Sequence, residues 1–282
     1  PEHIPEECGD NRPLLIAYVP SLTTIQELAL EVVAARAVLQ DSPELVHDSV
    51  ARKELKFRIK VAEQQFREYI GKLYSPNSED VLWFANGKQV EIKNARELSS
   101  HLSALCDSCY YKCPTINNEM ISYDNLSNVA ARARRVLVEA MATRAGEKQL
   151  GLKGFGPEVA VYRSLLLSEG LHQQDEATGC WRFCLEGTDS RLQHVWKEIS
   201  DSIADAGDKG VTVADILERL YQPPFGMKQG AAPIYICLYI LVKSDEVAVF
   251  REGGYQPYLT AAYMALMLKR PELFTIKQFT ST

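Results

Sequence analysis

Cysteine spacing offers the first candidate for chemistry. Cys106, Cys109 and Cys113 follow one another at intervals of three and four residues, a pattern that could bring thiolates to a metal ion. A structural zinc site takes four ligands and usually draws them from two such groups. The nearest other pair, Cys180 and Cys184, lies on an expected strand and supplies no convincing fourth ligand. We therefore expect no metal site and interpret Cys106 and Cys109 as core residues of a helix, because cysteine is often buried.

Histidines and glycines give no catalytic pattern either. His172 follows Gly170 and Leu171 at an expected helix end, where a capping or packing role is the simpler interpretation. The glycines at 151, 154 and 156 resemble a phosphate-binding loop, but no strand precedes them and the Walker lysine is missing. Pro157 explains them as the start of a helix. The sequence thus predicts no catalytic residue, no bound cofactor and no enzyme activity within this chain.

One dense basic cluster comprises Arg132, Arg134 and Arg135. Arg132 and Arg135 share a helix face opposite an apolar stripe, and Glu139 lies one helical turn after Arg135, where it could form an ion pair. Two interpretations stay open: a solvated helix face, or a surface that contacts a phosphate backbone or an acidic partner. The full set of candidate binding residues is Arg132, Arg134, Arg135, Lys228 and Arg251.

The bulk composition limits the class of protein. The 282 residues carry 31 basic and 37 acidic side chains, a net charge of −6, so any contact with nucleic acid must come from a local patch. Residues 231–242 form the longest apolar run, which is shorter than the roughly 18 residues of a membrane span. Seven cysteines without a regular framework suit a reducing compartment. We expect a cytoplasmic protein with no membrane contact.

Hydrophobic periodicity divides the chain into four regions. Residues 1–20 are expected to be a lead-in, with Leu14–Val19 as the last strand of a sheet in an upstream domain. Residues 21–75 show two heptad-like seams that predict a long helical hairpin, the second helix being about 39 Å long. The seams are expected to pack on each other; binding of a partner helix is the alternative. Residues 76–187 predict a helical region with a β-hairpin at Asn86-Gly87.

Residues 188–282 predict a winged-helix-like domain, because three helices are followed by a hairpin. The third of these helices, within residues 230–243, is apolar on nearly all faces and is therefore expected to be buried. We do not expect it to read the major groove, which requires polar and basic side chains. The predicted fold class is mainly α with small β-hairpins: a helical hairpin, a helical middle region and a C-terminal winged-helix-like domain.

Several segments resemble parts of a known family. They are Cys113–Ile121, Leu126-Ser127, Ala130–Met141, Pro157-Glu158 with Tyr162, Gly170–His172, Pro223–Gly226 and Arg270–Phe274. They resemble blocks of large bacterial P-loop ATPases from phage-defence islands, of the type seen in BREX phage-exclusion systems. The resemblance implies that an ATPase module precedes this region and that ATP is the cofactor of the parent protein.

The resemblance also suggests a function. It implies a non-catalytic region that couples the motor to other subunits of a defence complex or to the DNA phosphate backbone. The alternative is a stand-alone winged-helix DNA-binding regulator. A stand-alone enzyme ranks last, because no nucleophile–base pair or metal cluster is evident in the sequence.

Overall fold

The computed structural model describes residues 13–46, 48–78 and 80–279. The chain divides into two compact units, residues 1–109 and 110–282. Both units combine helices with small antiparallel sheets, which confirms the predicted class of a mainly α protein with small β elements. In the described part of the chain, no helix is both long enough and apolar enough to cross a bilayer.

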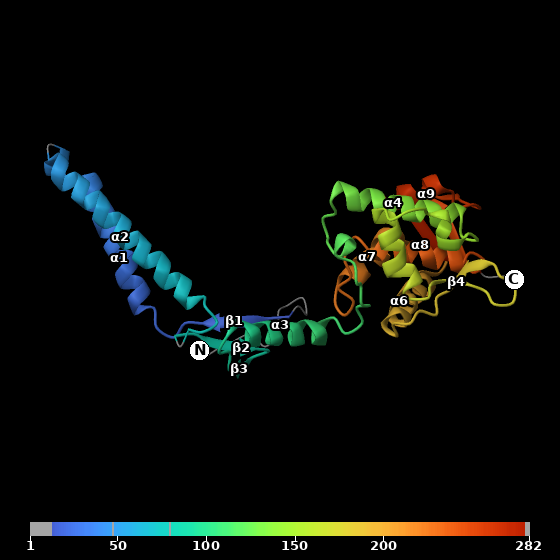
Figure 1. Ribbon diagram of the computed structural model, residues 1–282, viewed down its shortest axis with the longest axis horizontal. Helices are drawn as coiled ribbons and strands as arrows, with labels where there is room; N and C mark the ends of the chain where they lie inside the picture. The colour runs from blue at the N-terminus through green and yellow to red at the C-terminus, as the bar shows by residue number, and fades with distance from the viewer. Residues whose placement is uncertain (1–12, 47, 79, 280–282) are drawn as a thin grey trace. The chain divides into compact units, whose positions relative to one another are not determined.

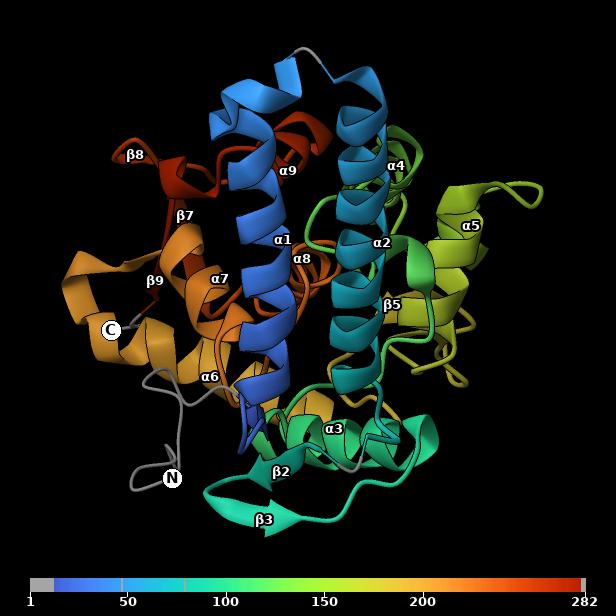
Figure 2. The same cartoon turned by 90° about the vertical axis from the view of Figure 1, so that its left-hand side faces the viewer.

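Two long helices dominate the first unit. Helix α1 (Thr23–Asp41) and helix α2 (Ser49–Leu73) lie side by side as an antiparallel pair (Figure 2). Ile59 and Ala62 of α2 are buried in the seam between them, and Arg36 of α1 donates to Glu63 of α2 over 2.6 Å. The prediction that the two seams pack on each other is therefore confirmed.

A three-stranded sheet and one more helix, α3 (Ala95–Cys109), complete this unit. Strands β2 (Leu82–Ala85) and β3 (Lys88–Val90) form the predicted hairpin, with Asn86 at φ 48° and Gly87 at φ 73°, as a type I′ turn requires.

Strand β1 (Leu15–Tyr18) pairs antiparallel with β2. We expected this strand to end a sheet of an upstream domain, but its ladder partner lies within this chain. The physical reason is that the β2–β3 hairpin leaves one edge of β2 open, and the backbone groups of β1 pair with that edge.

The second unit is built from six α-helices and two sheets in the described residues. The helices are α4 (Asn128–Thr143), α5 (Pro157–Tyr162), α6 (Arg191–Ala206), α7 (Val213–Tyr221), α8 (Ala232–Val242) and α9 (Ala261–Met267). Strands β4 (His172–Gln174) and β5 (Trp181–Phe183) form a hairpin. A four-stranded sheet has the order β6 (Val211–Thr212), β9 (Phe274–Gln278), β7 (Val247–Arg251) and β8 (Gly254–Tyr255).

Short helical turns lie between the helices and strands of both units. The 3-10 turns are Pro43–Val46, Glu119–Ile121, Lys148–Gly151, Gly207–Lys209 and Pro271–Leu273, and Arg163–Leu167 continues α5 as a π-helical turn.

Helix α8 is the centre of the second unit. Every residue from Ala232 to Ile240 is buried, which confirms the prediction made from its apolar sequence. A helix that is apolar on all sides can be stable in water only when other elements surround it. Helices α4 and α7 pack against it (Figure 1), and so does strand β5. The ring of Trp196 meets the ring of Tyr235 edge-on, with 5.6 Å between their centroids.

The backbone makes a close contact just before α8. A Cβ atom on Gly230 would lie 2.0 Å from the carbonyl oxygen of Ile121, a distance that no side chain tolerates. Glycine at this position therefore lets the segment that ends at Ile121 lie directly against the turn that leads into α8.

We predict that Gly230→Ala lowers the free energy of unfolding by about 1–3 kcal/mol, the usual cost of overpacking a tight interior. Gly146→Ala is the matched control, because a Cβ atom there would meet nothing within 4 Å. Chemical denaturation of the three proteins measures both effects. Equal stability of the two variants would show that the close approach to Ile121 is not a constraint.

Candidate functional site

The predicted binding residues all lie in the second unit but in three different places. Arg132, Arg134 and Arg135 are on α4, Lys228 is in the turn before α8, and Arg251 ends β7. The structure therefore does not gather them into one site, and each place has its own surroundings.

Arg134 turns into the protein and does not join its two neighbours at the surface. Its Nη1 donates to the carbonyl oxygen of Gln229 over 2.5 Å, and its buried Nε has no hydrogen-bond partner among the residues that the structure describes. Burial lowers the pKa of the guanidinium. The side chain lines a cavity of ≈ 320 Å³ together with Tyr221 and Pro233. The three arginines thus do not act as one basic cluster, because each step along a helix rotates the side chain by about 100°.

Arg132 and Arg135 remain exposed on α4. Arg132 forms no ion pair with the residues that the structure describes, whereas the Nε of Arg135 lies 3.7 Å from a Glu139 carboxylate oxygen. This is the one-turn pairing that the sequence suggested. An exposed pair of this kind contributes about 0.3–0.5 kcal/mol, so an incoming phosphate could displace Glu139 at little cost.

Lys228 and Arg251 both lie beside carboxylates. The Nζ of Lys228 is 3.1 Å from Asp124, and the Nε of Arg251 is 3.4 Å from Glu252 without making a hydrogen bond. Arg251 also lies over the ring of Tyr263, 5.8 Å from its centroid. Both cations lie closer to a carboxylate than Arg135 does, so they are weaker candidates than Arg132 and Arg135.

The first unit carries a second basic surface, which was not predicted from the sequence. Lys53, Lys56 and Lys60 are exposed on α2, and none forms an ion pair within the described part of the chain. Their spacing of three and four residues places them on one face of the helix, and that spacing was the signal that could have revealed them.

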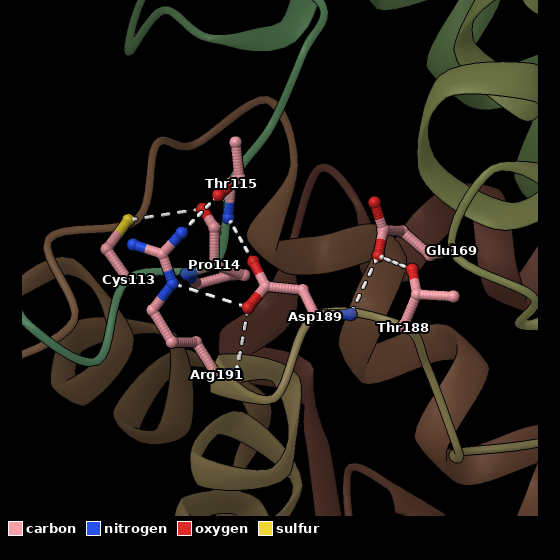
Figure 3. A network of polar contacts seen from close by, with 7 residues as sticks. All are labelled: Cys113, Pro114, Thr115, Glu169, Thr188, Asp189 and Arg191. Atoms are coloured by element: carbon pink, nitrogen blue, oxygen red, sulfur yellow. Dashed lines mark hydrogen bonds and ion pairs between the residues drawn. The ribbon is translucent and has the colours of Figure 1, made fainter.

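Figure 3 shows how the segment around Thr115 is held. The two carboxylate oxygens of Asp189 accept hydrogen bonds from the backbone N–H groups of Thr115, over 2.7 Å, and of Arg191, over 2.9 Å. The guanidinium of Arg191 also donates to the Thr115 hydroxyl. Burial alone would raise the pKa of Asp189, but these hydrogen bonds outweigh it and hold the pKa below its usual value. Asp189 therefore joins two segments that are far apart in the sequence.

Glu169 extends this network. One of its carboxylate oxygens accepts hydrogen bonds from the Thr188 hydroxyl, over 2.7 Å, and from the Asp189 backbone N–H, over 3.1 Å. Both carboxylates thus fix the chain just before α6. Each holds backbone in place, and neither is oriented toward a reactive group in the contacts that the structure records.

Asn118, in the block that carries the family resemblance, also has a structural role. Its side-chain oxygen accepts from the Met120 N–H over 3.0 Å, capping the turn Glu119–Ile121. Its amide nitrogen donates to the Ser164 hydroxyl over 2.8 Å. The polar side chain therefore ties this segment to the π-helical turn after α5.

His172 is buried between aromatic rings. Its Nδ1 accepts from the Tyr162 hydroxyl over 2.9 Å, and its Nε2 donates to the Ala145 carbonyl over 2.8 Å. The rings of Trp181 and Phe183 lie 5.1 and 4.8 Å away, centroid to centroid. Burial lowers the pKa of His172, although the bond to Ala145 opposes this. The packing role that we expected is confirmed.

The cysteines do not behave as one group. Cys106 is exposed, so its interpretation as a core residue is wrong: of α3, only Leu105 is buried. Cys113 is half-buried, and its Sγ lies 3.7 Å from the Pro114 carbonyl oxygen. Cys237, in α8, is fully buried, which raises the pKa of its thiol to about 12. Within the described ranges, no three His, Cys, Asp or Glu side chains are arranged to hold a metal ion.

Comparison with known proteins gives no match: no protein-family model, no curated protein and no solved structure matches this chain. The function is therefore inferred from the contacts described above and from the sequence motifs.

We predict that the free energy of unfolding falls as the pH is lowered through about 6.5. An unfolded histidine binds its proton near that pH. The folded pKa of His172 is lower, so the unfolded state binds more protons in this window. The stabilisation is complete above about pH 6.5 and is lost as the pH falls toward the lowered pKa. Denaturant titrations from about pH 8 to about pH 5 measure this dependence.

His172→Gln supplies the control for this prediction, since glutamine can hydrogen-bond but does not titrate. Its stability should depend less steeply on pH in the same window. The same steepness in both proteins would mean that other groups cause the effect.

Proposed function

We propose that this chain is a non-catalytic region of a large P-loop ATPase of the phage-defence type, and that it couples the ATPase to partner subunits or to nucleic acid. One observation carries the proposal: polar residues that belong to the family-like motifs, or that bond to them, hold distant segments together. Asp189 fixes Thr115, Asn118 fixes Ser164, and His172 fixes Ala145. Such residues suit a scaffold.

A rigid scaffold is what coupling requires. A displacement applied at one side of a close-packed body is transmitted to the other side, because packed interiors deform little. The buried α8 and the Asp189 network give the second unit this property. In this proposal ATP is the cofactor of the parent protein, which acts in the bacterial cytoplasm, and this region needs no cofactor of its own.

We also propose that the C-terminal part is winged-helix-like. The order α6, β6, α7, α8 and the β7–β8 hairpin follows that of a winged helix, and β9 joins the sheet between β6 and β7. Helix α8 stands where a DNA-reading helix would. Exposing Ile234 or Ile236 to a groove would cost about 1.5–3 kcal/mol each. We therefore assign nucleic-acid contact to Arg132 and Arg135 and not to α8.

The alternative function is a stand-alone winged-helix DNA-binding regulator, which the same element order favours. The complete open reading frame separates the two. A phosphate-binding loop encoded upstream supports the ATPase, whereas a complete frame without one supports the regulator.

We predict that the chain binds duplex DNA weakly and without sequence preference. The affinity should fall as the salt concentration rises, because Arg132 and Arg135 each contact one phosphate. The log–log slope contributed by Arg132 and Arg135 should be about −1.8, at about −0.9 for each phosphate. The double variant Arg132→Gln, Arg135→Gln should lose this part of the slope. Fluorescence anisotropy at several salt concentrations gives both numbers.

The charge-matched control is Lys197→Gln with Lys209→Gln, two exposed lysines of the same unit. It should bind as the wild type does. If the arginine variant keeps the wild-type affinity and slope, Arg132 and Arg135 are only a solvated helix face.

A further inference from the structure

We propose that the loop 147–156 presents Phe155 as a stacking platform for an unpaired nucleobase, with the cations around it contacting the adjoining phosphates. The partner is thus single-stranded nucleic acid. The proposed function leaves the class of partner open. The present inference names that class, and in this respect it rests on the proposed function. It concerns a different surface from Arg132 and Arg135, so the two can fail separately.

The Phe155 side chain is 91% exposed, more than any other exposed large hydrophobic residue in the described part of the chain. A solitary exposed apolar residue is common and needs no explanation by itself. The loop beneath this ring is different, because it is rigidly built and positively charged. Those two properties, together with the exposure, indicate a contact surface.

The loop is anchored at several points. The Nη1 of Arg144 donates to the Gly151 carbonyl over 3.1 Å, and the side chain of Gln149 donates to the Leu152 carbonyl over 2.7 Å. Leu150 is completely buried in the core. These contacts hold residues 149–152 at the base of the loop, close to the position of Phe155 in the chain.

The same contacts hold the backbone in an unfavourable conformation. Gln149 and Leu150 have φ of 55° and 52°, in the left-handed region that non-glycine residues avoid. Such conformations are unfavourable and persist only where the surroundings enforce them. A loop that merely connected α4 to α5 would not need this conformation. Its retention is consistent with a loop shaped to present its tip.

Glycines flank the ring on both sides. Gly154 has φ of 77°, and a Cβ atom there would meet nothing within 4 Å, so the space beside it is open. Gly156 follows Phe155 and likewise carries no side chain. A Cβ atom on Gly156 would meet the carboxylate of Glu158, and the guanidinium of Arg163 lies over the ring, so a flat molecule can approach from the open side at Gly154.

One cation lies beside the ring, and the same segment of the chain carries further basic residues. The guanidinium of Arg163 lies 5.8 Å from the centroid of Phe155 and also donates to Gln149 over 3.2 Å. Lys148 and Lys153 are exposed and, like Arg163, form no ion pair with any residue in the described ranges. Residues 144–163 carry four basic and two acidic side chains, 4 − 2 = +2, in a chain with a net charge of −6. The basic ones are Arg144, Lys148, Lys153 and Arg163, and the acidic ones are Glu147 and Glu158.

Single-stranded nucleic acid fits these features better than a protein pocket. A pocket closing over Phe155 would also cover the guanidinium of Arg163 and remove its water, which is costly for a charge without a partner. A stacked base covers one ring face only, and each base brings a phosphate for Lys148, Lys153 or Arg163. Aromatic stacking in a basic surface is the usual way in which proteins bind single strands without sequence preference.

The test uses the full chain and a fluorescein-labelled oligothymidylate of about 20 nucleotides, since binding sites for single strands cover about 4–16 nucleotides. Phe155→Ala should weaken binding about 5- to 150-fold, because stacking one base is worth about 1–3 kcal/mol. The salt slope should not change, since no cation is removed. Tyr258→Ala is the matched control: this exposed aromatic residue lies elsewhere, and its loss should have no effect.

Two further substitutions separate stacking from apolar contact. Phe155→Trp should bind at least as tightly as the wild type, and the fluorescence of the new indole should be quenched when a base stacks on it. Phe155→Leu should bind as weakly as Phe155→Ala, because leucine is apolar but has no aromatic face. Poly-glutamate is the probe for an acidic protein partner, and its binding should not differ between the wild type and Phe155→Ala.

The outcomes decide between the two surfaces. Loss of single-strand binding in Phe155→Ala, with binding retained in the Arg132, Arg135 double variant, supports the platform even if the α4 surface fails. The platform is refuted if Phe155→Ala binds like the wild type, if Phe155→Leu restores binding, or if the wild type binds no oligothymidylate at low salt. Equal weakening by Phe155→Ala and Tyr258→Ala would also refute it.

Discussion

Burial of α8 is the constraint on which the second unit depends. The helix has no polar face, so α4, α7 and β5 must enclose it to keep its side chains from water. The chain before and after α8 is held close by the same requirement, as the contact between Gly230 and Ile121 shows. A core of this kind leaves little freedom for the segments around it, and they must be joined by specific contacts.

Polar residues that belong to the motifs, or that bond to them, supply those contacts. Asp189 accepts hydrogen bonds from Thr115 and Arg191, and His172 lies between Tyr162 and Ala145. Asp189 and His172 bond to backbone groups and, in the case of His172, to a neighbouring hydroxyl. This use of polar groups underlies the proposal that the region couples other parts of a larger protein.

Sequence periodicity predicted the features that depend on residues close together in the chain. It did not predict contacts between segments that are far apart in the sequence. The apolar stretch of α8, the Asn86-Gly87 turn and the seam between α1 and α2 follow from spacing alone, because each depends on residues within a few turns of one another. The pairing of β1 with β2 joins Leu15 to Ala85, and no local pattern records it. The inward turn of Arg134 depends on which segment covers α4, which spacing also cannot supply. The exposure of Phe155 depends on how the loop around it folds, so the spacing of residues did not indicate it.

Amide hydrogen exchange tests the central claim, that α8 is the enclosed core of the second unit. If it is, the amides of α8 open only when the whole unit unfolds, and they should be among the slowest to exchange. Those of α1, which has no fully buried residue, should exchange much faster. Exchange of α8 at the rate of α1 would contradict the account, because it would show that the helix opens to water without unfolding of the unit.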